Sequence, residues 1–304
     1  MSLALMFPGQ GSQSPGFLHA LPNQPAIQET LQEASELLGK DVLSLDSETA
    51  LTSTVATQMA LVVAGAAFAR LCSSAGIQPI ALAGMSVGVY SAAIAAESID
   101  LSTALFLVRR RAELMEQAFP AGAYGMAVVE GLNLRTVQTL LEKTDTAIAN
   151  YNSATQFVVS GKLDELHHVL QKSILAGAHT AKLLRMSVAS HVPALLSAAK
   201  ELNEFAQEFH FAPPRIPIYS NRTARALTTA ESVREELASN MAYPVRWHDI
   251  VAVLESVGIT LLLESPPGHT LSRLASTILP GISAIPVSEQ RWDVVLRAAM
   301  RESN

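Results

Sequence analysis

A serine between two glycines is the first feature of this 304-residue chain that could perform chemistry. Residues 84–88, GMSVG, match the G-x-S-x-G pattern, in which a sharp strand-to-helix turn holds the serine hydroxyl outward. The apolar run IALAG precedes Ser86, and a helix-like pattern follows it. Side chains at the two glycine positions would crowd the backbone of such a turn. The pattern predicts Ser86 as a nucleophile, with a plain tight turn as the alternative.

A glycine-rich loop near the start of the chain could assist this nucleophile. The segment FPGQGSQ, residues 7–13, follows the apolar run LALMF, and its glycines allow successive N–H groups to converge on an anion. The helix after Ser86 would add the N–H groups and the positive dipole end of its first turn. Both features favour a negative charge that develops during a reaction, which strengthens the interpretation of Ser86 as a nucleophile.

Composition describes a globular protein and argues against two classes of partner. With 49% hydrophobic and 16% charged residues, the chain can bury one large core or a main domain with a smaller companion. Its net charge of −6 and the lack of a long basic run are unlike a nucleic-acid binder. The longest apolar stretch, residues 59–69, stops at Arg70, well short of the roughly 20 residues of a membrane span. We expect neither nucleic acid nor a membrane as partner.

Other reactive residues carry weaker signals. The N-terminus lacks the pattern of a secretion signal, so a cytoplasmic location is expected. Cys72 is the single cysteine and lies in a helical pattern, which favours a buried apolar role over a thiol mechanism. His167 and His168 are adjacent and would diverge on a helix, and no other pair has metal-ligand spacing. We therefore expect no metal site.

Predicted strands and helices alternate along most of the chain. Such alternation favours a mostly parallel sheet that is covered by helices on both faces. The short apolar runs LALMF, IALAG, IPIY and ITLLL predict strands, and helices are predicted over residues 25–38, 55–71, 101–118, 195–209 and 246–255.

A central segment has a different order of elements. Between about Gly122 and Ser187 the patterns read strand, helix, strand, strand, helix, strand. This is the order of a ferredoxin-like unit. We predict residues 122–188 as an inserted small domain, and residues 1–121 and 189–304 as the large domain.

Six ordered motifs resemble the landmarks of the malonyl-CoA:acyl carrier protein transacylases. The resemblance covers nearly the whole chain, and six motifs in order are far more specific than any one of them. The motifs are FPGQGSQ at 7–13, GMSVGVYSA at 84–92, RRRAELMEQA at 109–118, NYNSATQFVVSG at 150–161, SVASH at 187–191 and ESPPGHTL at 264–271.

The resemblance implies a fold and a mechanism. The fold is an α/β-hydrolase-like large domain with a parallel sheet and an inserted ferredoxin-like small domain. The mechanism is ping-pong transfer of a malonyl group from malonyl-CoA to the phosphopantetheine-type arm of an acyl carrier protein, with no bound cofactor. Carried over by motif, Ser86 is the nucleophile, His191 is the general base, and the backbone N–H groups of Gln10 and Val87 form the oxyanion hole.

Two histidines compete for the role of base. Position alone favours His269, because ordinary α/β-hydrolases place their histidine in a loop after a late strand. The resemblance favours His191 instead, since the base of the transacylases follows the small domain and is oriented by a backbone carbonyl.

Arg111 and Asn152 are predicted substrate contacts. Arg111 matches the family's helix arginine, and a planar guanidinium can hold the free carboxylate of a malonyl group by two parallel hydrogen bonds. The alternative for Arg111 is a solvated position beside Arg109 and Arg110. Asn152 is a possible substrate contact or a simple turn cap.

The elbow departs from the usual fatty-acid pattern GHSLGEY, with Met85 for the histidine and Val89 for the glutamate. GMSVG is similar to the epsilon subunit of bacterial malonate decarboxylases, so the leading hypothesis is transfer to the small carrier subunit of such a complex. Transacylation in fatty-acid or polyketide synthesis is the close alternative. A thioester hydrolase and an inactive carrier-binding scaffold are the further ones.

A basic rim beside the cleft is a further expectation, because carrier proteins are acidic. Arg109, Lys182 and Arg185 are its predicted members.

Overall fold

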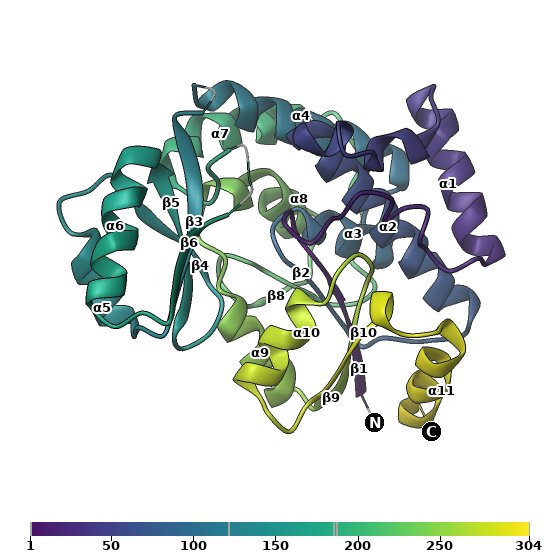
Figure 1. Cartoon of the computed structure of the whole chain (residues 1–304). Coiled ribbons are helices and arrows are strands. Elements are labelled where there is room, and N and C mark those ends of the chain that lie inside the picture. Colours follow the sequence, from purple (N-terminus) through teal and green to yellow (C-terminus); the bar gives the residue numbers. More distant parts are fainter. Residues whose placement is uncertain (1, 121, 185, 187, 304) are drawn as a thin grey trace.

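The protein contains two sheets that lie side by side, each with its own helices (Figure 1). The computed structural model describes residues 2–120, 122–184, 186 and 188–303. The larger unit holds both chain ends, and the smaller one is formed by a continuous central part of the chain. The predicted fold class, an α/β protein with a parallel sheet and an inserted ferredoxin-like unit, is confirmed.

The large sheet has six strands in the order β10-β9-β1-β2-β7-β8. All neighbours pair in parallel except β7 and β8, which are antiparallel. The central strand β1 is apolar along nearly its whole length because helices cover both of its faces. The strands are β1 (Ser2–Phe7), β2 (Ala81–Gly84), β7 (Ile218–Tyr219), β8 (Ala226–Leu227), β9 (Ile259–Glu264) and β10 (Ser283–Pro286).

Alternate residues of β1 enter different cores, as the pleat of a strand requires. Leu3, Leu5 and Phe7 pack in the larger core with α1 to α4, α7, α8 and α11, whereas Ala4 and Met6 pack with α9 and α10. The helices of this unit are α1 (Pro25–Leu38), α2 (Thr54–Ser74), α3 (Gly88–Ala95), α4 (Leu101–Ala118), α7 (Leu196–Ala206), α8 (Ala230–Ser239), α9 (Trp247–Ser256), α10 (Thr270–Ile278) and α11 (Trp292–Ser303).

Helix α2 is the central helix of the larger core. By length and composition it is the one helix of the described residues that could cross a membrane, but 83% of its most apolar 18-residue window is buried inside the protein. It contacts α1, α3 and α4. The predicted buried helix is therefore a core helix that begins at Thr54, where the Ser53 side chain accepts the N–H of Ala56.

The small sheet is antiparallel throughout, in the order β4-β5-β3-β6. With two helices on one face, this is the strand order of a ferredoxin-like unit. The limits 122–188 of the predicted domain stay a prediction. The elements are β3 (Tyr124–Glu130), α5 (Leu134–Leu141), β4 (Ala147–Tyr151), β5 (Gln156–Lys162), α6 (Leu163–Leu175) and β6 (Thr180–Leu183).

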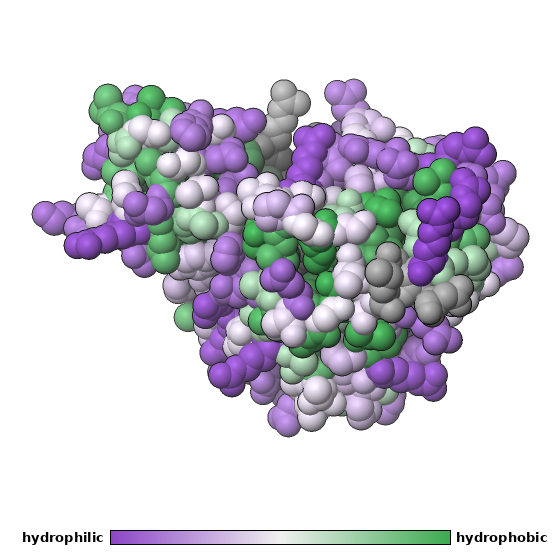
Figure 2. All heavy atoms as spheres, turned by 90° about the horizontal axis from the view of Figure 1, so that it is seen from below, coloured by the Kyte–Doolittle hydropathy of each residue, from purple (hydrophilic) through white to green (hydrophobic). Residues whose placement is uncertain are grey.

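The outer surface is mostly polar on the face seen from below, with apolar side chains gathered in its middle and at the small-sheet end (Figure 2).

Three helices of the large unit have no counterpart in the sequence prediction, namely α8, α10 and α11. The predicted strand IPIY is also shorter than expected, since only Ile218 and Tyr219 join the sheet.

Candidate active site

The turn at Ser86 has the geometry of a nucleophile elbow. Strand β2 ends at Gly84, Ser86 adopts a left-handed φ of 54°, and α3 begins at Gly88. A Cβ atom on Gly88 would lie 2.1 Å from the carbonyl oxygen of Phe7, and one on Gly84 would lie 2.2 Å from the carbonyl carbon of Gly88. Both glycines are therefore required, because the turn is packed against itself and against β1.

Asn221, in the turn after the neighbouring strand β7, holds this strained turn. Its Oδ1 accepts the N–H of Ser86 at 2.7 Å, and its Nδ2 donates to the carbonyl of Gly84 at 2.7 Å. The buried Glu236 carboxylate in turn accepts the N–H of Asn221 at 2.8 Å and the hydroxyl of Ser220 at 2.6 Å. Sequence reasoning missed Asn221, although its position two residues after β7 places it beside the end of β2.

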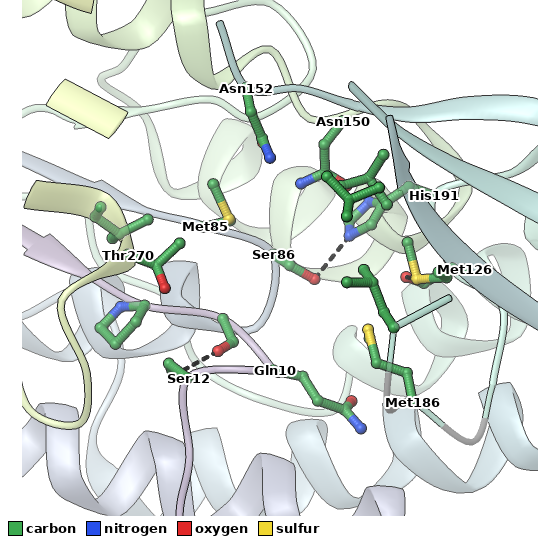
Figure 3. A pocket seen from close by; sticks show the side chains of 18 of the residues that line it. Gln10, Ser12, Met85, Ser86, Met126, Asn150, Asn152, Met186, His191 and Thr270 are labelled. Atoms are coloured by element: carbon green, nitrogen blue, oxygen red, sulfur yellow. Dashed lines mark hydrogen bonds between the residues drawn. The ribbon is translucent and has the colours of Figure 1, made fainter. Parts of the chain in front are cut away.

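His191 lies directly against Ser86 (Figure 3). Its Nε2 is 2.8 Å from Ser86 Oγ, and its Nδ1 lies 2.9 Å from the carbonyl oxygen of Asn240 and 3.0 Å from that of Tyr243. Two carbonyls can only accept, so Nδ1 carries the proton and Nε2 is free to accept the serine hydroxyl. This orientation by backbone carbonyls is the arrangement that the resemblance implied.

The His191 ring is buried, with 2% of the residue exposed. Burial, together with the positive charge of Arg111, lowers the pKa of His191 to about 4, although both carbonyl contacts oppose the shift. The imidazole is consequently neutral near pH 7 and can accept a proton. Of the motif SVASH, Ser187 lies outside the described residues.

His269, which position alone favoured, is engaged elsewhere. Its Nδ1 lies 2.5 Å from a carboxylate oxygen of Glu289, and its side chain is partly exposed. No contact between His269 and Ser86 occurs among the described residues. The hydrogen-bonded pair in this structure is Ser86 and His191.

Arg111 is completely buried beside this pair. Its Nη2 donates to Ser86 Oγ at 3.1 Å and to Asn240 Oδ1 at 3.3 Å, while its Nη1 donates to Gln58 Oε1 at 2.7 Å. Burial lowers the pKa of Arg111, but a guanidinium remains protonated in proteins. Among the described residues no carboxylate forms an ion pair with it.

The two arginines that precede Arg111 on α4 have different surroundings from it. Arg109 pairs with Glu113, and Arg110 pairs with Glu113 and Glu201, all at the surface. On a helix, three consecutive residues point in three directions. The solvated alternative therefore describes Arg109 and Arg110, whereas Arg111 enters the protein interior.

The predicted oxyanion donors lie on two loops that meet at the carboxyl ends of β1 and β2. In the described part of the chain, neither the N–H of Gln10 nor that of Val87 has a hydrogen-bond acceptor. The N–H of Ser86 is already bound by Asn221. Gly9 brings the first loop close, since a Cβ there would be 2.8 Å from the carbonyl oxygen of Met85. These two N–H groups thus remain available to a developing oxyanion.

A cavity of about 240 Å³ opens over Ser86 and His191 (Figure 3). The large unit contributes its floor through the loops after β1 and β2 and the first turn of α10, and the small sheet contributes an opposite wall that includes Met126 and Val158. Asn152 lines it too, donating through Nδ2 to Gln156 Oε1 at 3.1 Å while its buried Oδ1 has no partner in the described structure. Gln10 and Met85 also line the cavity near the serine (Figure 3).

The remaining reactive residues lie outside this constellation. Cys72 is buried in α2, and burial raises the pKa of its thiol, which disfavours the thiolate. Within residues 2–120, 122–184, 186 and 188–303, no group of three His, Cys, Asp or Glu residues could hold a metal ion.

The chain matches known proteins in both sequence and structure. The acyl transferase domain family matches residues 5–279. A malonyl CoA-acyl carrier protein transacylase of Salmonella typhimurium is 32% identical over 94% of this chain and 96% of its own length. The structure of the malonyl CoA-acyl carrier protein transacylase (fabD) from Coxiella burnetii superposes with a TM-score of 0.94 at 31% identity, covering 99% of this chain and 98% of that one.

A second similar structure includes a carrier protein. It is a complex of a malonyl-transacylase with its type II polyketide synthase acyl-carrier protein, with a TM-score of 0.92, 32% identity and coverage of 99% of this chain and 100% of that one.

Proposed function

This chain belongs to the acyl transferase domain family, and from that membership we propose that it transfers a malonyl group from malonyl-CoA to the phosphopantetheine thiol of an acyl carrier protein. The proposed setting is fatty-acid or polyketide synthesis, in the cytoplasm. The names of the reported relatives support this setting more than the malonate decarboxylase complex that the elbow sequence favoured.

The observation that carries the proposal is the buried Arg111 cation beside the Ser86–His191 pair, which forms no ion pair with any carboxylate of the described residues. A buried charge is stable only with an opposite charge or full hydrogen bonding. An acyl group that ends in a carboxylate supplies that charge and places its thioester carbonyl near Ser86. A neutral acetyl group would leave the cation unpaired, at a cost of roughly 2 to 5 kcal/mol.

The first half-reaction forms an acyl-enzyme. His191 Nε2 takes the proton of Ser86 while Oγ attacks the thioester carbon, and the N–H groups of Gln10 and Val87 stabilise the oxyanion. The carbon–sulfur bond then breaks, and the imidazolium returns its proton to the sulfur of CoA. Each oxyanion donor of this kind contributes about 10² to 10³ in rate.

The second half-reaction repeats these steps with a new thiol. The carrier's thiol gives its proton to His191 and attacks the ester carbon, and the Ser86 oxygen leaves with that proton. Water competes with the thiol at this stage. The apolar wall of the small sheet, which includes Met126 and Val158, supports transfer because it limits water in the cavity.

Acylation is tested by incubation with malonyl-CoA and mass spectrometry of the intact protein. We expect a malonyl adduct on Ser86 that persists until a thiol acceptor is added, and no adduct on the Ser86→Ala variant. Rapid release of malonate without any acceptor would favour a hydrolase. An unmodified protein under all conditions would favour an inactive carrier-binding scaffold.

The carrier is tested with two acceptors. We expect the acyl-enzyme to be discharged by the holo carrier of fatty-acid or polyketide synthesis. Discharge only by the carrier of malonate decarboxylase, which bears phosphoribosyl-dephospho-CoA, would instead support the hypothesis that this chain is the epsilon subunit of such a complex. Met85 and Val89 in the elbow motivated that hypothesis.

The basic rim remains part of the proposal. Arg109 is exposed but paired with Glu113, and Lys182 is exposed on β6. Arg185 lies outside the described residues. Charge reversal at Lys182 should slow discharge by the carrier and leave acylation by malonyl-CoA unchanged. Equal damage to both half-reactions would refute a role in carrier docking.

A further inference from the structure

Two neutral amides hold the Arg111 guanidinium in place. Gln58 Oε1 accepts from Nη1 at 2.7 Å, and Asn240 Oδ1 accepts from Nη2 at 3.3 Å. Both residues are buried, with 1% and 0% exposed respectively. Each amide oxygen accepts one N–H bond from the guanidinium without removing its charge, and the buried Nε has no hydrogen-bond partner among the described residues. The orientation of Arg111 and its charge balance are therefore separate features of the site.

The buried carboxylates of the described structure serve other groups. Glu236 accepts from Ser220 and Asn221, and Glu264 accepts the N–H groups at the start of α10. Asp46 accepts the N–H of Leu18. None of these three contacts Arg111. Within the described residues, the core thus contains carboxylates, but amides lie against the one buried guanidinium.

The contacts of Gln58 also fix which end of its amide faces Arg111. Its Nε2 lies 3.4 Å from Gln10 Oε1 and 3.6 Å from Met115 Sδ, and both of these atoms can only accept. The oxygen is therefore turned to Arg111. Gln58 belongs to α2, where nearly all neighbouring side chains are apolar and buried. A polar residue in this core helix is accounted for by its bond to Arg111.

We infer that Gln58 and Asn240 are specificity-determining residues, because their neutrality leaves the charge of Arg111 to be balanced by the carboxylate of the acyl group. This inference rests on the proposed function and adds the residues that set its substrate class. A carboxylate at position 58 would act as an internal counter-ion. The pocket would then bind neutral acyl groups, and an acyl carboxylate would meet a second negative charge.

Asn240 links the same cation to the reacting pair. Its Nδ2 donates to the carbonyl of Ser86 at 3.2 Å, and its own carbonyl accepts from His191 Nδ1. A carboxylate at position 240 would lose the bond to the Ser86 carbonyl as well as add a charge. Gln58 is consequently the cleaner position for a test, and Asn240 is the second one.

The test compares Gln58→Glu with the uncharged control Gln58→Met. The rates of acyl-enzyme formation are measured by mass spectrometry with malonyl-CoA and with acetyl-CoA, and the ratio of the two rates is the readout. We expect Gln58→Glu to lower the malonyl-to-acetyl ratio by about 30-fold or more. Gln58→Met should slow both reactions while its ratio stays close to that of the wild type.

An unchanged ratio in Gln58→Glu, or an equal fall in Gln58→Met, would overturn the inference. A wild-type protein that forms no malonyl adduct would instead overturn the proposed function, so the two failures are distinguishable. Thermal unfolding shows whether each variant is folded. If Gln58→Glu is unfolded, Asn240→Asp takes its place with the same expected fall in the ratio. Unfolding of both would also contradict the inference, because a counter-ion to Arg111 should be tolerated.

Discussion

The two sheets contribute to the site in different ways. The large parallel sheet is covered by helices on both faces, and the loops at its carboxyl ends carry Ser86 and the Gln10 loop. The small antiparallel sheet has helices on one face only. Its other face bears Met126, Ala149 and Val158, which form a small apolar cluster beside the cavity.

The large sheet therefore positions the reacting groups, whereas the small sheet forms a wall of the cavity. A strained turn such as Ser86 persists only where the surrounding packing determines it, and the large sheet provides that packing. The small sheet supplies apolar surface and the two amides Asn150 and Asn152 (Figure 3). We therefore expect substitutions in the large unit to cause large losses of rate. Substitutions in the small unit should instead change the partition of the acyl-enzyme between transfer and hydrolysis, or the affinity for the acyl group.

The largest effect is expected at His191, whose side chain belongs to the reacting pair. Replacement by alanine removes the proton acceptor of Ser86 and should reduce acyl-enzyme formation by roughly 10² to 10⁴-fold. Quenched-flow mass spectrometry with malonyl-CoA measures this rate. The matched control is His269→Ala, which should retain most of the activity. A greater loss at His269 would contradict the assignment of the base.

A smaller loss is expected at Asn221, which touches only the backbone of the elbow. Asn221→Ala removes both hydrogen bonds that hold the left-handed turn, and a displaced nucleophile should react about 10- to 100-fold more slowly. The Michaelis constant for malonyl-CoA should change little, because Arg111 is untouched. A pure change in the Michaelis constant would show that Asn221 acts on binding instead.

The pH profile tests the environment of His191. Since burial and Arg111 lower its pKa to about 4, the neutral base persists as pH falls from 7 to 5, and kcat/KM for acylation should decline only near pH 4. Arg111→Ala removes the positive charge and should raise this pKa, which moves the acidic limb to higher pH. Acetyl-CoA serves as substrate for both proteins. An unchanged limb would mean that Arg111 does not influence the base.

The smallest effect is expected in the small sheet. Met126→Ala shortens the wall over the cavity and should admit water, so the malonyl adduct should hydrolyse a few-fold faster while its formation is nearly unchanged. The half-life of the isolated acyl-enzyme without acceptor measures this. Leu134→Ala, on the far helix face, is the control. Slower formation of the adduct in Met126→Ala would show that the small sheet affects the acylation step itself.

Local patterns were sufficient for most elements. Helix α4 begins and ends at the predicted residues, because Asp100 caps its start and apolar residues recur at helical spacing. The helix α8 was missed, although Thr229 and Ser232 form a capping box at its start. Helix α10 was also missed, because no side-chain cap marks its start and its first turn is held by Glu264 at the end of β9.

By itself the sequence determined the strand-to-helix turn at Ser86, the order of elements in the small unit, most of the elements in the large one, and the family resemblance, because these depend on neighbouring residues and on motif order. Only the tertiary structure decided that His191 rather than His269 contacts Ser86, and that Arg111 is buried while Arg109 is exposed and Arg110 is partly exposed. It alone brought Gln58, Asn221 and Asn240 to the site. The physical reason is that these contacts join residues far apart in the chain, so their chemistry depends on burial and distance, which no local pattern contains.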